Sequence, residues 1–116
     1  MTGRASYAAG LGAEETVERY YARLGAETLA RRFRGGGGEI DLIVRLGGVI
    51  VFVEVKARRS LEAAAEAISP AQWGRLEAAA RAYIQKQAIA SDADMRFDVA
   101  LLDRAGGLEV IEGVIP

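Results

Sequence analysis

The chain has 116 residues, enough for one domain with a buried core but too few for two. It contains no cysteine and no histidine, which excludes disulfides, thiolate metal sites and histidine catalysis. A bound metal would therefore need oxygen ligands and would be Mg²⁺ or Mn²⁺. The formal net charge of −1 gives no general attraction to nucleic acid, so nucleic-acid binding would need a local basic patch. No apolar run approaches the length of a membrane span, and we expect a cytoplasmic protein without a membrane partner.

The first predicted helix begins at Ala13, after a segment of small residues, 1–12, that we expect to be a loose arm. An apolar stripe at helical spacing marks its buried face. The stripe consists of Val17, Tyr20, Tyr21 and Leu24. Gly25 stands where a helix C-terminal cap is expected. Glu27–Arg34 is a weaker strand candidate, and Gly35–Gly38 is predicted to be a loop with no preferred conformation.

A hairpin of two strongly apolar strands follows, with Gly47 and Gly48 as its turn. In a two-residue hairpin the numbers of opposed residues here sum to 95. Asp41 should therefore face Glu54, and Glu39 should face Lys56. Opposed side chains lie about 4.5–5.5 Å apart, where two carboxylates repel by roughly a few kcal/mol at an effective dielectric near 20. A fold selected only for stability would avoid that pair, whereas a divalent cation requires it.

The second half of the chain predicts one long helix. Residues 57–68 are charged and alanine-rich, and we expect a surface loop or a short extra helix there. Ser69 is a good N-cap for the long helix, Pro70 suits its first position, and Gln72 completes a capping box. Its buried stripe is expected to contain Trp73, Leu76, Ala80, Tyr83 and Ile84.

Two further strands, Met95–Leu102 and Leu108–Ile115, give the element order α-β-β-β-α-β-β. Val49–Val53 is apolar on both faces, so its strand should be central in the sheet. The step from this strand through the long helix to Met95–Leu102 indicates a right-handed crossover between parallel neighbours. We therefore expect a single α/β domain, residues 1–116, with a mixed sheet flanked by helices.

The hairpin offers the chemistry of a metal site. Alternation places Glu39, Asp41, Glu54 and Lys56 on one face. Asp41 and Glu54 could hold Mg²⁺, with the Val55 carbonyl as a third oxygen and a bound water as the nucleophile. Lys56 would position or deprotonate that water, or neutralise developing charge. The simpler alternative is a solvated edge with cross-strand salt bridges, but charges on a central strand are costly unless they are used.

Charged residues elsewhere could complete the site. The first helix carries Glu14, Glu15 and Glu18, any of which could add a ligand. Acidic residues in a first helical turn also suit the helix dipole, so a solvated helix face is the alternative for them. Five basic residues flank the site in sequence, as a phosphate-binding surface or as ordinary surface charge. They are Arg31, Arg32, Arg34, Arg58 and Arg59.

The segments 38–43 and 51–58 resemble the bacterial YraN-like family of predicted endonucleases. That family is related to archaeal Holliday-junction resolvases and to the restriction-endonuclease-like PD-(D/E)XK nucleases. The resemblance runs from about Gly10 to Leu102, and Arg34 fits an arginine ahead of the first motif. It implies a restriction-endonuclease-like sheet.

The resemblance also assigns roles to residues. It implies that Asp41, Glu54 and Lys56 form the nuclease triad, with Glu14 as the helix carboxylate. One departure stands at the start of the second long helix, where the family usually has a Lys-Gln pair and this chain has Gln72 followed by tryptophan. Arg75 still fits the pattern that follows. The change could alter phosphate contacts, or mark a member whose activity has drifted.

Together these observations predict Mg²⁺- or Mn²⁺-dependent hydrolysis of phosphodiester bonds in DNA, branched or otherwise structured. Glu39 and Gln72 are possible accessory residues. A resolvase-like enzyme would be expected to act as a homodimer, so that two sites cut two strands. The alternatives are a non-catalytic nucleic-acid-binding protein that keeps the nuclease scaffold, and a structural or partner-binding domain. The residues predicted to bind nucleic acid are Arg32, Arg34, Arg58, Arg59 and Arg75.

Overall fold

The structure is a computed structural model that describes residues 3–114, with side chains from Gly12 onward. Its elements are α1 (Gly3–Arg23), β1 (Glu27–Gly35), β2 (Gly38–Leu46), β3 (Val49–Ala57), α2 (Leu61–Ala65), α3 (Pro70–Lys86), β4 (Met95–Leu102) and β5 (Leu108–Ile111). This is the predicted order, with α2 as the short extra helix. None of the helices in the described part of the chain is long and apolar enough to cross a membrane.

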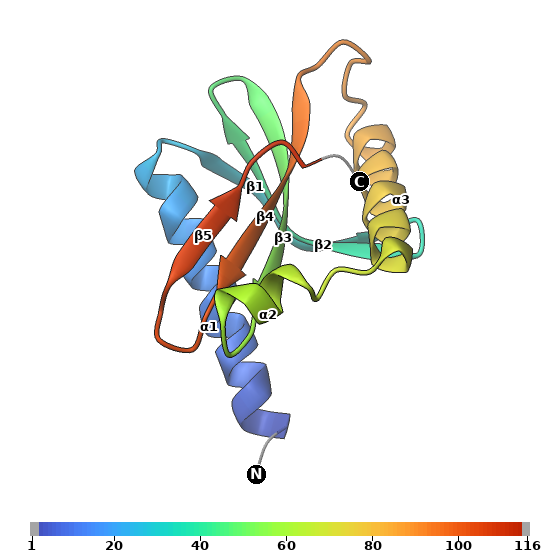
Figure 1. Cartoon of the computed structure of the whole chain (residues 1–116). Coiled ribbons are helices and arrows are strands. Elements are labelled where there is room, and N and C mark those ends of the chain that lie inside the picture. The colour runs from blue at the N-terminus through green and yellow to red at the C-terminus, as the bar shows by residue number, and fades with distance from the viewer. Residues whose placement is uncertain (1–2, 115–116) are drawn as a thin grey trace.

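The five strands form one mixed sheet in the order β1-β2-β3-β4-β5 (Figure 1). Strands β3 and β4 are parallel, and α3 lies in the connection between them, which confirms the predicted crossover. The other neighbouring strands are antiparallel. β3 is therefore central, and its residues are covered on both faces.

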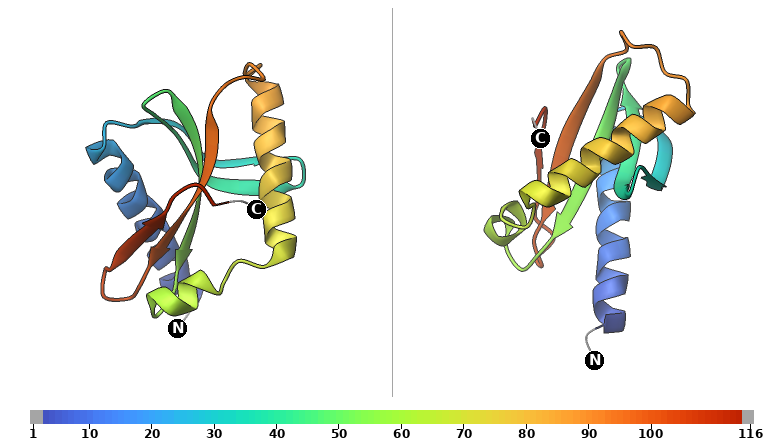
Figure 2. Two further views of the ribbon diagram at one scale, coloured as in Figure 1. Left: turned by 45° about the horizontal axis from the view of Figure 1, so that its top comes forward. Right: turned by 90° about the vertical axis from the view of Figure 1, so that its right-hand side faces the viewer.

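Helices α1 and α3 cover opposite faces of the sheet (Figure 2). Alternate residues of β3 separate the two faces, because Val51 and Val53 pack in the core under α1, whereas Ile50 and Phe52 pack in the core under α3. On the α1 side of the sheet, the buried residues of the helix are Ala13, Val17 and Tyr21. On the α3 side of the sheet, the buried residues of the helix are Leu76, Ala79, Ala80 and Tyr83.

Both ends of the chain differ from the prediction. Helix α1 begins at Gly3, so most of the segment 1–12 is helical where we expected a loose arm. The segment has three alanines beside its three glycines and no proline, so nothing in it stops the helix from extending back from Ala13. The last strand is shorter than predicted and ends at Ile111, and Gly113 follows with a φ of 66°. Of the predicted strand, Ile115 lies outside the described residues.

The glycine run at 35–38 is an ordered turn, contrary to our expectation of a loop without a preferred conformation. Gly35 pairs with Gly38, and the two residues between them have φ values of 60° and 84°, as in a tight hairpin turn. This turn packs on the backbone of α3. A Cβ atom on Gly36 would lie 2.6 Å from the carbonyl oxygen of Ala78, so the close approach requires glycine.

The β1–β2 ribbon bends sharply before it reaches α3. The bend lies between the pairs Arg31–Leu42 and Phe33–Ile40, where Arg32 has a φ of 51°. Ile40 packs in the same core as Ile43, three residues further along, so the alternation of faces is broken between them. Asp41 lies within this break.

Candidate functional site

The candidate site lies where β2 separates from β3. The two strands pair from Leu46–Val49 to Leu42–Val53, which confirms the predicted register up to that point. Beyond it the backbone N–H of Val55 donates a hydrogen bond of 2.8 Å to Oδ2 of Asp41. A side-chain carboxylate thus stands in for the strand's carbonyl group and fixes Asp41 at the point of divergence.

Glu54 is the centre of the site. It lies on the α3 face of β3 with only 6% of its surface exposed. Its Oε2 atom accepts a hydrogen bond of 2.6 Å from the side-chain amide of Gln72 and lies 3.3 Å from Nζ of Lys56. The Lys56 side chain is itself mostly buried, with 12% exposed. A carboxylate, an ammonium group and an amide therefore meet on the central strand.

The electrostatics of the site oppose full ionisation. Burial, followed by the hydrogen bond and the negative charge of Asp41, raises the pKa of Glu54 from 4.5 to about 8. Lys56 lowers this pKa but does not overcome the other causes. Glu54 therefore holds a proton near neutral pH, and a cation supplied from outside could take the place of that proton.

The other buried carboxylate, Asp98, shows the contrast. It is 1% exposed and accepts hydrogen bonds from the hydroxyl of Tyr21 at 2.7 Å, the guanidinium of Arg96 at 3.0 and 3.1 Å and the backbone N–H of Gly113 at 3.1 Å. Donors and a positive charge satisfy it, so it serves the fold. Glu54 also has donors, Gln72 and Lys56, but it faces the carboxylate of Asp41 as well, and that like charge has no structural benefit.

Two predicted acidic members lie apart from this pair. The Glu39 carboxylate lies 2.7 Å from Nε of Arg34, so the expected pairing of Glu39 with Lys56 does not form. The bend in β2 explains this, because a register extrapolated through a break in alternation no longer holds. Glu14 of α1 lies 2.8 Å from Nε of Arg32. Among the residues that the structure describes, no three acidic side chains gather as a metal-binding group.

The predicted basic residues divide into two sets. The three on β1 are paired with carboxylates, since Arg31 contacts Glu18 at 2.6 Å and its two neighbours in the set contact Glu14 and Glu39 as above. The other set is exposed and has no carboxylate within 4.0 Å in the described part of the chain. It consists of Arg58, Arg59 and Arg75. Arg75 lines a cavity of about 620 Å³ with Arg34 and the glycine turn.

The structure brings Gln72, which the sequence suggested as an accessory residue, into contact with Glu54. Ser69 caps α3 as predicted, because its Oγ accepts a hydrogen bond of 3.2 Å from the Gln72 backbone N–H. The Gln72 side chain does not complete a capping box and binds Glu54 instead. The position of Gln72 in the sequence could have indicated this contact, because the first turn of a crossover helix lies near the end of the strand that precedes it.

The donor set suits a hard divalent cation. Asp41 and Glu54 provide carboxylate oxygens side by side, and Mg²⁺ in proteins takes one or two carboxylates and keeps several waters. Glu54 is buried and Asp41 is partly buried, so two negative charges at this place are costly unless a further cation compensates them. The residues present therefore fit Mg²⁺ or Mn²⁺.

The regions in which this chain is similar to known proteins include all the residues of the candidate site. Residues 13–102 match the uncharacterised protein family UPF0102. The chain is 45% identical to a UPF0102 protein of Roseobacter denitrificans over 97% of its own length and 88% of the relative's. It is 46% identical to a UPF0102 protein of Cereibacter sphaeroides over 97% and 96% of the two lengths. A UPF0102 protein of Methylorubrum populi is 46% identical over 85% and 79%.

Proposed function

This chain belongs to the UPF0102 family, and from its site we propose that it hydrolyses phosphodiester bonds of DNA with Mg²⁺ or Mn²⁺ held by Asp41 and Glu54. One observation carries the proposal. Asp41 of β2 and Glu54 of the central strand β3 meet in a partly dehydrated position beside Lys56, at a cost that burial and mutual repulsion impose. The resemblance of the surrounding motif to predicted endonucleases supports the same reaction.

The residues of the site have distinct roles in this proposal. Asp41 and Glu54 would hold the cation, and the Val55 carbonyl would be a further oxygen ligand. The cation supplies a Lewis acid that polarises the phosphate and lowers the pKa of the attacking water. Lys56 is held 3.3 Å from Glu54 and places a positive charge where the phosphate becomes more negative.

Substrate binding depends on a local concentration of positive charge. Because the net charge is −1, DNA is attracted only where arginines are free of carboxylate partners. Arg58 follows the Lys56 strand directly, and Arg75 lies one turn along α3 from Gln72, so both flank the site. The resolvase-like resemblance favours branched or otherwise structured DNA and a homodimer, in which two sites cut two strands.

Cleavage of end-labelled branched and linear DNA in Mg²⁺, in Mn²⁺ and in EDTA tests the proposal. We expect cleavage that requires a divalent cation and that falls at least about 100-fold in Asp41→Ala and in Lys56→Ala. Glu77→Gln, a half-buried acidic position on α3 that pairs with Arg81, is the matched control and should cleave normally. Equal cleavage by all variants would assign the activity to a contaminant and contradict the proposal.

A second candidate function is nucleic-acid binding without cleavage. The hydrogen bond of 2.6 Å from Gln72 to Glu54 favours it, because this amide occupies an oxygen that the cation needs. Salt-dependent DNA binding with no cleavage in either metal would support this function. A chain with no salt-dependent affinity for DNA would instead be a structural or partner-binding domain.

A further inference from the structure

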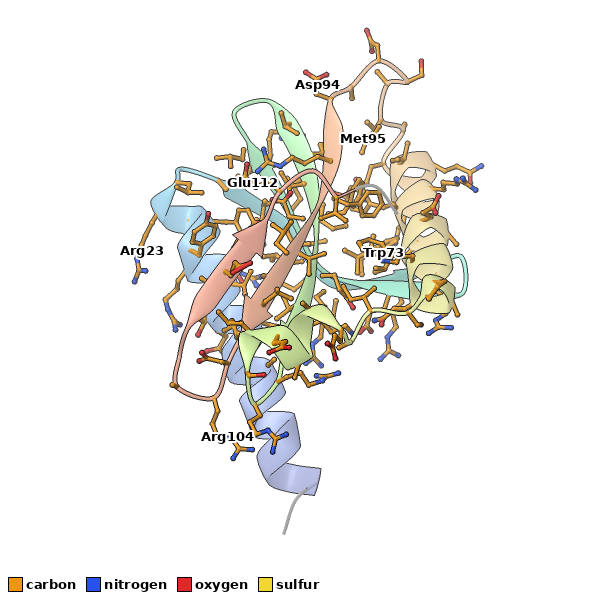
Figure 3. All side chains as sticks on the ribbon, in the orientation of Figure 1. Arg23, Trp73, Asp94, Met95, Arg104 and Glu112 are labelled. Atoms are coloured by element: carbon orange, nitrogen blue, oxygen red, sulfur yellow. The ribbon has the colours of Figure 1, made fainter. Side chains whose placement is uncertain are left out.

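A groove of about 700 Å³ lies at the end of the sheet where β3 and β4 finish. Helix α1 forms one wall, and the segments that follow β3 and β4 form the other. Figure 3 shows Arg104 at this end of the molecule, beside α1 and far from Asp94 and Met95 at the opposite end. The charged residues of its lining are Glu14, Arg58, Arg59, Asp103 and Arg104.

Backbone hydrogen bonds hold the two segments together. The N–H of Arg58 donates to the carbonyl of Leu102 at 2.9 Å, and the N–H of Arg104 donates to the carbonyl of Arg59 at 3.5 Å. The turn that carries Arg104 is closed by Asp103, whose carboxylate accepts a 2.7 Å hydrogen bond from the N–H of Gly107. The backbone segments that carry Arg58, Arg59 and Arg104 are thus held together by hydrogen bonds.

The charge of this groove is unbalanced. Both of its carboxylates are engaged, Glu14 by the guanidinium of Arg32 and Asp103 by its own turn. In the described part of the chain, the three arginines of the groove have no carboxylate within 4.0 Å and are exposed. The Arg58 guanidinium donates to the Ala57 carbonyl at 2.8 Å, which leaves its other N–H groups for a ligand.

The groove and the candidate site lie on opposite faces of β3. Val55 lines the groove and packs toward α1, whereas the neighbouring Glu54 is bonded to Gln72 of α3. Both surfaces meet at the C-terminal end of β3, where Arg58 comes two residues after Lys56. A chain of phosphates that passes around this strand end would contact the two surfaces in succession.

We propose that this groove binds the phosphate backbone of the DNA strand where the strand continues beyond the Asp41–Glu54 site. Arg104, which lies outside the sequence segments 38–43 and 51–58, would contact a phosphate there. The proposal rests on the proposed function, because DNA is the polyanion that the neighbouring site would bind. Guanidinium groups on a fixed backbone suit phosphate oxygens, which accept several charge-assisted hydrogen bonds. The groove thereby adds affinity without reading the sequence of the DNA.

The dependence of DNA affinity on salt tests the groove. Binding is measured in Ca²⁺ at several salt concentrations for the wild type, Arg104→Ala and the control Arg81→Ala, an exposed arginine on α3. We expect Arg104→Ala to weaken binding roughly tenfold and to reduce the slope of log affinity against log salt by about 1. Arg81→Ala should leave both unchanged. Identical affinities and slopes for Arg104→Ala and Arg81→Ala would overturn the proposal.

A location-specific measurement uses the absence of cysteine from the chain. A fluorophore on Ala105→Cys, next to Arg104, should change its emission when DNA binds. The same fluorophore on Ser91→Cys, in the exposed loop at the opposite end, should not respond. Equal responses at both positions would contradict binding in the groove.

The outcomes separate this proposal from the proposed function. If Arg104→Ala weakens binding but the wild type cleaves no DNA in any metal, the groove stands and the catalytic proposal falls. If DNA is cleaved and Arg104→Ala binds as the wild type does, the groove falls and catalysis stands. If the wild type has no salt-dependent affinity, both fall.

Discussion

At the scale of single residues, the two buried carboxylates, Glu54 and Asp98, show the difference between a structural and a functional acidic residue. Both accept hydrogen bonds from neighbouring donors and both have a cationic partner, but of the two Glu54 alone also faces a second carboxylate, that of Asp41. Holding a buried carboxylate against a like charge is costly, and groups whose pKa is perturbed in this way cluster at functional sites. The same residue type thus serves stability in one strand and chemistry in the next, and partners rather than burial distinguish the two roles.

The raised pKa of Glu54 gives a stability prediction. In the folded chain Glu54 keeps its proton up to a pH of about 8, whereas in the unfolded chain it loses it near 4.5. Between these values the folded state binds more protons, so this group lowers the free energy of unfolding as pH rises. Glu54→Gln removes the effect and should be as stable as the wild type near pH 4 but more stable at pH 8.5, on the order of several kcal/mol.

Urea denaturation of both proteins across this pH range measures the difference. If the difference in free energy of unfolding between the variant and the wild type does not widen with pH, Glu54 has an ordinary pKa. Mg²⁺ at pH 8.5 should then stabilise the wild type and leave Glu54→Gln unchanged, because only a folded state with the carboxylate binds the cation.

At the scale of elements, the β2–β3 hairpin was predictable and the β1–β2 ribbon was not. Gly47 and Gly48 specify a two-residue turn, and the register that follows from it is observed up to Leu42–Val53. The bend at Arg32 has no local signal in the sequence, and beyond it the glycine turn lies against the backbone of α3. That bend displaced Glu39 from the face where the simple register placed it.

The glycine turn gives a prediction about this packing. Gly36→Ala and Gly37→Ala both force alanine into a positive φ, at a cost of about 1–2 kcal/mol. Only Gly36→Ala also drives a Cβ atom onto the Ala78 carbonyl, whereas Gly37 faces open space. We expect Gly36→Ala to lose a further ~1–3 kcal/mol of unfolding free energy. Equal losses in the two variants would show that the turn does not depend on contact with α3.

At the scale of the whole molecule, the Asp98 network joins parts of the chain that are distant in sequence. Tyr21 of α1, Arg96 of β4 and the N–H of Gly113 all bond to one carboxylate. The sequence predicted the helix and the strand but not this connection, because a hydrogen bond across 77 residues leaves no local pattern. The amphipathic stripes and the crossover rule were sufficient for the sheet and its two covering helices.

Removing one bond from this network should weaken the fold without affecting the site. Tyr21→Phe deprives the buried Asp98 of a donor and should lower the free energy of unfolding by about 1–3 kcal/mol. Tyr20→Phe, next to it and only partly buried, is the matched control and should change stability by less than about 0.5 kcal/mol. DNA cleavage below the unfolding transition should be the same in both variants. A loss of cleavage in folded Tyr21→Phe would place the network in the site.

Binding of Mn²⁺ to the purified chain at pH 8.5, followed by calorimetry, tests the central claim most directly. Asp41 and Glu54 form one site, so we expect one Mn²⁺ per chain, with affinity reduced by a factor of about 10–100 or more in Asp41→Asn and in Glu54→Gln. Glu77→Gln should bind as the wild type does. Absence of Mn²⁺ binding in the wild type, or unchanged binding in Asp41→Asn, would contradict the claim that this carboxylate pair holds a metal ion.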